Sequence, residues 1–451
     1  MVRRLNIWSD LKKLSLILAA AQLFAVLDLR AQDLGFPPLP SGSGPEKKIL
    51  DQYPEKPSLP AAFTIPVGPL RYSAPGPFYL LRRQSLASLD FLDENRLLFT
   101  FRVSGMIQRG ADDNSASEKQ RIRAVVVALR DGKIESEAEW TVPDRARYLW
   151  MLKDGHFMLR VPEGLDRGDA ALKMTPFLRF PGQLLWLELD PTQQFMITNS
   201  LEPAPAGQDV GEPNPSTPTQ ASAVADGQKP GAQSVLVART LQRESGEVTR
   251  VARFPWTHQT EDSPMNSQGY LQKSPDGGPR WLLKLNYFDG RTRDMARVDS
   301  TCPPKYSFVS DTALFLTTCD PESGGWKLAV LTGNREKFWH VWEQKTSWNA
   351  IWPMLVMAPN GSLIARETLI LKRPVNRYKN LLGAKDIEGQ MVRVLDAATG
   401  KVVLEAPLTP MLDGGGNVAI SPSGQRVAIL NAGAIQVFQL PAPAPSPVAE
   451  K

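Results

Sequence analysis

Apolar residues alternate with polar ones along most of the chain, in short stretches separated by turn-forming residues. Asp, Asn and Gly tolerate the positive φ that tight hairpins require, and Pro presets φ at the second position of a turn. Each stretch therefore predicts a β-hairpin. The seven turns of this kind are centred on Asp93, Asp154, Asp190, Asp276, Asp311, Asn360 and Ser423.

A second kind of hairpin falls between most of these turns. Successive turns of the first kind are on average about 50 residues apart, when the low-complexity segment described below is not counted. Two alternating hairpins per repeat make a four-stranded antiparallel unit, and repeats of roughly 40 to 50 residues are typical of propeller blades. The hairpins of the second kind lie at residues 129–140, 241–254, 287–298, 331–342 and 395–408.

Several of the expected strands are apolar on both faces, for example residues 125–129, 184–189 and 328–331. A β-sandwich would expose one face of each sheet and show clean alternation, whereas radially packed blades bury both faces. A β-helix would have a much shorter and stricter repeat. The sequence therefore predicts an all-β fold, a propeller of about 6–7 four-stranded antiparallel blades.

The two ends of the chain are expected to close the ring. The last strands are predicted at residues 417–421, 425–431 and 434–440, and Phe78–Ser85 supplies a candidate fourth strand. Pairing strands from both ends in one blade removes an exposed sheet edge.

Composition predicts the following organisation. A signal peptide spans residues 1–31, and a disordered or extended spacer spans 32–69. The propeller spans 70–441, carries a low-complexity loop inserted at 201–233, and is followed by a disordered tail at 442–451. The three low-complexity segments are rich in Pro, Ala, Gly and small polar residues, which bury too little surface to fold.

The first 31 residues place four basic side chains before an apolar run from Leu14 to Leu27, and end on Ala31. This is the pattern of a secretory signal peptide, and the alternative is an uncleaved anchor. We expect a secreted or periplasmic protein with no stable membrane span after cleavage. Removing five basic and two acidic residues with the signal lowers the net charge from +5 to +2. With no dense basic stripe, no nucleic-acid partner is expected.

The corners SPDG at Ser274, APNG at Ala358 and SPSG at Ser421, with DAATGKVV at Asp396–Val403, resemble the repeats of TolB-type, quinoprotein-like and tryptophan-aspartate-repeat propellers. The chain also resembles uncharacterised exported bacterial propellers. These resemblances imply the fold and a tendency to bind partners, and they transfer no functional residue.

The two cysteines, Cys302 and Cys319, flank one predicted hairpin. If Ser310 and Asp311 form a two-residue loop, the cysteines face each other in a non-hydrogen-bonded pair, where side chains approach closely. We expect a structural disulfide, and the alternative is two reduced core cysteines. No CxxC motif supports a redox role.

Evidence for catalysis is thin. The chain has no G-x-S-x-G elbow and no phosphate-binding glycine loop. Its histidines, His156, His258 and His340, are scattered, so neither a metal nor a cofactor is expected. Residues 274–281 resemble the Asp-box of sialidases, with Arg280 where that family has Thr, but an ordinary corner explains them as well. We expect no enzymatic activity.

Four of the eleven tryptophans gather at Trp339, Trp342, Trp348 and Trp352. Exposed tryptophans stack on sugars or anchor protein partners, and buried ones fill the space between blades. Two hypotheses remain. The first is an exported scaffold that binds a protein or glycan on a propeller face; its oligomeric state is unknown. The alternative is a polysaccharide hydrolase or lyase with two carboxylates at the mouth of the channel.

Overall fold

The structure is a computed structural model that describes most of the chain. The described residues are 52–75, 87–103, 119–143, 147–161, 164–203, 234–255, 264–320, 325–346, 350–372, 384–412 and 414–441. The predicted signal peptide, the interior of the 201–233 segment and the tail at 442–451 lie outside them. Within the described part no helix is long or apolar enough to cross a membrane.

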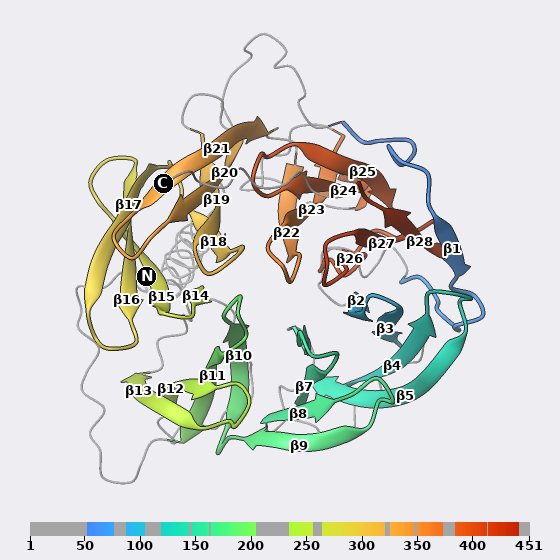
Figure 1. Ribbon diagram of the computed structural model, residues 1–451, viewed down its shortest axis with the longest axis horizontal. Coiled ribbons are helices and arrows are strands. Elements are labelled where there is room, and N and C mark those ends of the chain that lie inside the picture. The colour runs from blue at the N-terminus through green and yellow to red at the C-terminus, as the bar shows by residue number, and fades with distance from the viewer. Residues whose placement is uncertain are drawn as a thin grey trace, which may run out of the picture.

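Seven four-stranded antiparallel sheets stand around a central axis (Figure 1). This confirms the predicted propeller and sets the number of blades at seven. The first four blades are blade 1, β2 (Ala87–Asp93), β3 (Arg96–Arg102), β4 (Lys119–Ala128) and β5 (Ile134–Pro143); blade 2, β6 (Leu149–Met151), β7 (Phe157–Val161), β8 (Gly164–Gly168) and β9 (Met174–Arg179); blade 3, β10 (Gln183–Leu189), β11 (Phe195–Pro203), β12 (Ser234–Gln242) and β13 (Val248–Pro255); and blade 4, β14 (Met265–Asn266), β15 (Gly269–Pro275), β16 (Arg280–Tyr287) and β17 (Thr292–Asp299).

The remaining blades follow the same chain order except at the point of closure. They are blade 5, β18 (Lys305–Phe308), β19 (Ala313–Cys319), β20 (Trp326–Gly333) and β21 (Phe338–Thr346); blade 6, β22 (Ala350–Met357), β23 (Leu363–Leu371), β24 (Ile387–Asp396) and β25 (Val402–Leu408), with a short 3-10 helix at Ala384–Asp386; and blade 7, β26 (Val418–Ile420), β27 (Arg426–Asn431), β28 (Ala434–Gln439) and β1 (Phe63–Pro66). The first strand of each blade lies nearest the axis (Figure 1).

The blades are held together by apolar side chains packed between neighbouring sheets. Because strand residues point alternately to the two faces, an inner strand such as β23 sends apolar side chains to both neighbouring blades and is buried along its whole length. Six clusters of buried side chains fill the interfaces between blades 1 and 7, 6 and 7, 4 and 5, 1 and 2, 2 and 3, and 5 and 6.

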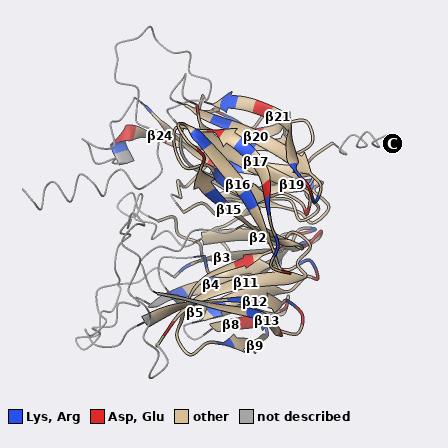
Figure 2. Cartoon of the chain, turned by 90° about the vertical axis from the view of Figure 1, so that its left-hand side faces the viewer, with Lys and Arg blue, Asp and Glu red and all other residues tan. Residues whose placement is uncertain are grey.

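The two faces of the ring differ. In a four-stranded meander the first and third turns lie at one end of the sheet, and the second turn and the link to the next blade lie at the other. We call these ends the hairpin face and the connection face. Most predicted turns lie on the hairpin face, where Gly132, Gly246 and Gly400 repeat one turn with φ near +70° (71°, 68° and 71°). Figure 2 shows the ring from the side.

One predicted turn, at Asp276, lies at the opposite end of its blade from the other turns of the same kind. Asp276 connects β15 to β16, the second and third strands of blade 4, so it lies on the connection face. The first turn of that blade is at Ser267 and Gln268, after the two-residue strand β14. The residues of SPDG specify a tight turn, but they do not specify which of the blade's turns it is.

The ring closes with a different strand from the one predicted. The strand beside β28 is β1, with Ile65 opposite Ile435, and residues 78–85 lie outside the described part of the chain. The propeller therefore begins before residue 70. The three C-terminal strands agree with the prediction.

The residues before β1 pack along the outer edge of blade 6. Ser58 exchanges two hydrogen bonds with the backbone of Glu405 in β25, at 2.8 and 2.9 Å. The ring of Tyr53 lies on Gly389, where a Cβ atom would come within 2.3 Å of a ring carbon. This part of the predicted spacer covers a sheet edge.

The outer strands of blades 1–6 are each interrupted by a one-residue bulge, shown by the register shifts between the third and fourth strands. Each bulge places two residues of the outer strand opposite one position of its partner. A bulged edge is a poor template for pairing with another chain. The regular array of outer edges is thereby protected against edge-to-edge aggregation.

Substitution of Ile65 tests whether β1 stabilises the closed ring. Ile65 is 4% exposed and packs in the cluster between blades 7 and 1, whereas Thr64 in the same strand is exposed. We expect Ile65→Ala to lower the free energy of unfolding by about 2–4 kcal/mol, and Thr64→Ala to change it little. Thermal and urea unfolding of both variants measure this. Equal stability of the two variants would show that β1 does not hold the ring.

Candidate functional site

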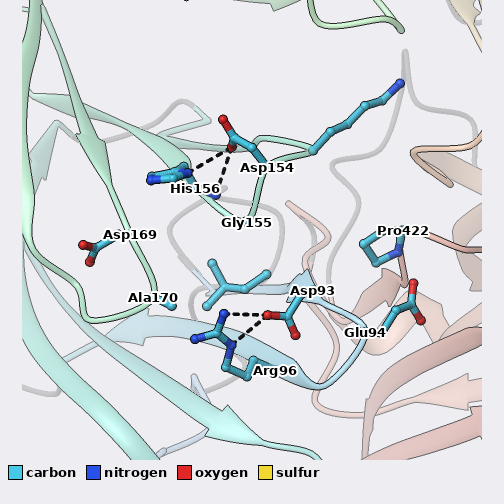
Figure 3. Close-up of a pocket in the computed structure, with 11 residues that line it drawn as sticks. Asp93, Glu94, Arg96, Asp154, Gly155, His156, Asp169, Ala170 and Pro422 are labelled. Carbon is cyan, nitrogen blue, oxygen red and sulfur yellow. Dashed lines mark hydrogen bonds and ion pairs between the residues drawn. The ribbon is translucent and has the colours of Figure 1, made fainter.

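A hollow of about 480 Å³ opens on the hairpin face where blades 1, 2 and 7 meet (Figure 3). It is built mainly from the tight turns of hairpins, which carry most of its side chains. The residues that line it are Leu92, Asp93, Glu94, Arg96, Lys153, Asp154, Gly155, His156, Asp169, Ala170 and Pro422.

Aspartates shape the three hairpins of blades 1 and 2 that surround the hollow. Asp93 accepts the N–H of Asn95 at 2.8 Å, and Asp154 accepts that of His156 at 3.1 Å. Asp169 accepts the N–H of Ala171 at 3.0 Å. An Asp side chain that caps its own turn two residues on is the local reason these sequences fold as hairpins.

Asp154 is the most heavily paired carboxylate of the hollow. Its Oδ2 accepts from Arg167 at 2.8 Å and from Arg243 of blade 3 at 3.2 Å, and its Oδ1 lies 3.2 Å from Nδ1 of His156. Partial burial alone would raise the pKa of Asp154, but the His156 N–H, Arg243 and the charge of Arg167 outweigh it and lower the pKa below its usual value. The group is a fixed negative charge rather than a proton donor.

Contacts between blades hold the hollow in place. Glu94 accepts the N–H of Ser423 at 2.6 Å, and its carbonyl accepts from Arg426 at 2.5 Å, which ties blade 1 to blade 7. On the other side Gln193 of blade 3 accepts the N–H of Lys153 at 2.7 Å and donates to the carbonyl of Met151 at 3.0 Å. The hairpins around the hollow are therefore held in place by contacts within the protein itself.

The charges of the hollow are mixed in sign. Asp93 pairs with Arg96 at 2.6 Å (Figure 3), and Lys153 forms no ion pair with the described residues. No cluster of His, Cys, Asp and Glu suited to a metal ion occurs among the described residues. The arrangement suits recognition of a surface with both signs of charge. The sequence predicts Asp93 and Asp154 only as turn residues. Both occupy the first turn of their blade, and first turns of neighbouring blades lie at the same end of the ring, which is the signal that places the two residues together.

The two histidines in the described part of the chain, His156 and His340, lie on different blades. His156 lines the hollow, and His340 is exposed on β21 of blade 5. His258 is outside the described residues.

The four predicted tryptophans do not form one described site. Trp342 donates its indole N–H to the carbonyl of Ala397 at 2.8 Å and packs on Gly400, so it fills the space between blades 5 and 6. Trp339 is 46% exposed on the outer strand of blade 5. Trp348 and the side chain of Trp352 lie outside the described part of the chain.

Cys302 and Cys319 are joined by a disulfide, with a Cα–Cα distance of 5.6 Å. The register used to predict the pair is wrong by one residue, because Lys305 lies opposite Thr317 and the turn is longer than two residues. Pro303 and Pro304 precede the paired part of the strand, so Cys302 lies beyond it. Ser300 accepts the N–H of Cys319 at 2.9 Å and donates to the carbonyl of Cys302 at 2.6 Å.

A buried carboxyl lies in the interface between blades 6 and 7. Glu367 of β23 accepts from the N–H of Gly416 and from Nε2 of Gln390, each at 3.3 Å. Burial raises the pKa of Glu367 to about 7, although backbone hydrogen bonds from Gly416 and Asn417 act in the opposite direction. The group is enclosed, so it affects stability rather than a surface reaction.

No known family model and no curated protein matches this chain. Among solved structures, it is similar to an acylaminoacyl peptidase of Pyrococcus horikoshii, with 12% identity, a TM-score of 0.42, and coverage of 76% of this chain and 49% of that one. It is also similar to the Swd1 β-propeller domain of Myceliophteria thermophila (11% identity, TM-score 0.39, 85% of this chain and 99% of that one). A third is an uncharacterised protein of Listeria monocytogenes (10% identity, TM-score 0.42, 81% and 97%).

The chain spans about half the length of the peptidase it matches. These similarities concern the fold alone, and the propeller assignment itself follows from the seven sheets.

Glu367 predicts a pH dependence of stability. Its pKa is raised in the folded state, so folding binds a proton, and stability falls as pH rises from the ordinary value of 4.5 towards about 7. We expect Glu367→Gln to abolish this decline and to be more stable than the unsubstituted protein at about pH 8, by roughly 1–3 kcal/mol. Urea unfolding across this pH range measures it. The exposed Glu247→Gln is the control, and a decline that persists in Glu367→Gln would contradict the assignment.

Proposed function

We propose that this chain is an exported, non-catalytic propeller that binds a polypeptide partner at the hollow on the hairpin face. The observation that carries the proposal is the preorganised charge of the hollow. Asp154 is held by arginines of two blades, and Glu94 is held by a third blade. Side chains fixed in this way lose little freedom on binding, and their mixed charges favour a partner surface of complementary pattern.

The alternative of a polysaccharide hydrolase or lyase receives no support from Asp154. A general acid needs a raised pKa, and the pKa of Asp154 is lowered. The other carboxylates of the hollow cap their own turns or accept backbone N–H groups, which suits structural and binding roles. Basic and acidic residues are interspersed along the strands shown in Figure 2, which favours a protein partner over a nucleic acid.

Export is part of the proposal. It is supported by the signal-like pattern of residues 1–31, by the disulfide, and by the resemblance of the corners to exported propellers. When the full chain is expressed in a bacterial host, we expect the form in the periplasm or medium to begin near Gln32 and to carry an oxidised Cys302–Cys319 pair. Intact-mass measurement with and without reduction tests both points. An unprocessed, reduced chain confined to the cytoplasm would contradict export.

The binding site is tested by photo-cross-linking in the cell envelope. A photoreactive residue in place of Ala170, which lines the hollow, should yield one discrete product. The same residue in place of Val251, exposed on the outer strand of blade 3, is the matched control and should yield none. We expect Lys153→Glu to reduce the Ala170 product about tenfold, because it reverses a charge of the hollow. No product, or equal products at both positions, would refute the site.

A further inference from the structure

Two carboxylates that line the hollow each keep one oxygen without a partner among the described residues. Glu94 accepts the N–H of Ser423 through Oε1, and its Oε2 accepts no hydrogen bond from that part of the chain. Asp169 accepts the N–H groups of Ala171 and Lys173 through Oδ1, each at 3.0 Å, and its Oδ2 likewise has no described donor. Neither carboxylate forms an ion pair with a described side chain, so each can bind a cationic group from outside.

The other charges around the hollow are engaged elsewhere. Asp93 and Asp154 have arginine partners, so their charges are compensated within the protein. Arg426 donates to the carbonyl of Glu94 and to the side chain of Gln439, and not to the Glu94 carboxylate. No described cation therefore competes with a ligand for that carboxylate.

Glu94 and Asp169 lie on opposite sides of the hollow (Figure 3). They do not converge on one point, so they do not suit a single metal ion, which needs its oxygen ligands grouped around it. Leu92, Ala170 and Pro422 add apolar surface to the lining. The side chains of Lys and Arg combine an apolar stem with a cationic end, so they can cover such a surface and still reach a carboxylate.

The third uncompensated charge of the lining is a cation. Lys153 is exposed, lines the hollow and forms no ion pair with the described residues. A small diamine could pair with two separated carboxylates, but Lys153 would repel it. A polypeptide segment can place an acidic side chain against Lys153 and basic side chains against the two carboxylates. The combination of charges therefore favours a polypeptide over a free amine.

We propose that the polypeptide bound in the hollow presents basic side chains to Glu94 and Asp169 and an acidic side chain to Lys153. This charge pattern rests on the proposed function, because it describes the partner of the same hollow. Both carboxylates are fixed by backbone N–H groups, so they lose little freedom when a partner binds. A hydrogen bond between a cation and a fixed carboxylate is also stronger than one between neutral groups.

Conservative substitutions of the two carboxylates test the pattern in the cell envelope, with the photoreactive residue in place of Ala170 as above. Glu94→Gln and Asp169→Asn remove the charge and keep the oxygen that accepts backbone N–H groups, and thermal unfolding verifies that the variants fold. We expect each to reduce the Ala170 product about tenfold. Asp289→Asn is the matched control and should change nothing. Asp289 caps the third turn of blade 4 as Asp169 caps that of blade 2, since it accepts the N–H of Arg291 at 3.0 Å.

Binding of the folded full chain to synthetic peptides tests the chemistry of the partner. The probes are an unstructured peptide that contains Lys, Arg and Glu, the same peptide with Gln in place of Lys and Arg, and 1,5-diaminopentane. We expect the mixed-charge peptide to bind at least about tenfold more tightly than the peptide without basic residues. Added salt should weaken its binding, because salt screens exposed charges. We expect no binding of 1,5-diaminopentane.

Three results would overturn the charge pattern. They are an Ala170 product that neither Glu94→Gln nor Asp169→Asn reduces, a mixed-charge peptide that binds no better than the one without basic residues, and binding of 1,5-diaminopentane alone. The last would identify a small amine as the ligand. In the first case the polypeptide partner still stands, because the product still forms. Absence of the product in the otherwise unsubstituted protein refutes the proposed function instead, and this pattern with it.

Discussion

The structure depends on covering both faces of every sheet with apolar side chains from the neighbouring sheets. Inner strands such as β23, which is buried throughout, have no face left for solvent. Two stacked layers would leave the outer faces uncovered, whereas a closed ring covers both faces of each blade. Stability is therefore shared among the interfaces between neighbouring blades.

Closure of the ring is a long-range event that orders the beginning of the chain. Residues before β1 cover the edge of blade 6, and β1 itself completes blade 7. Since β1 pairs with β28, residues near both ends of the chain form one sheet. The bulges in the outer strands of the other blades also protect sheet edges. Each bulge interrupts the regular hydrogen-bonding edge with which another chain could pair.

The hairpin face links this framework to the hollow that we propose as the binding site. Its turns are short because the strands of one meander must reverse direction within a few residues. The Asp side chains of these turns accept hydrogen bonds from backbone N–H groups of the same turn. Neighbouring turns then bond across blades, as Glu94 does with Ser423 and Gln193 with Lys153. A hollow among such turns combines a rigid frame with charged side chains. The buried Glu367 belongs to the framework, because its environment is the packed interface of two blades.

The sequence by itself determined the hairpins, the propeller class and the cysteine pair, because turn residues and strand alternation act over a few neighbouring residues. It did not determine that Asp276 turns on the connection face, that β1 closes the ring, or that Arg167 and Arg243 meet Asp154. Those outcomes require residues far apart in the chain to be brought together by the packing of blades. The paired side chains of the hollow are likewise products of tertiary structure, since no local pattern records which turns of different blades lie side by side.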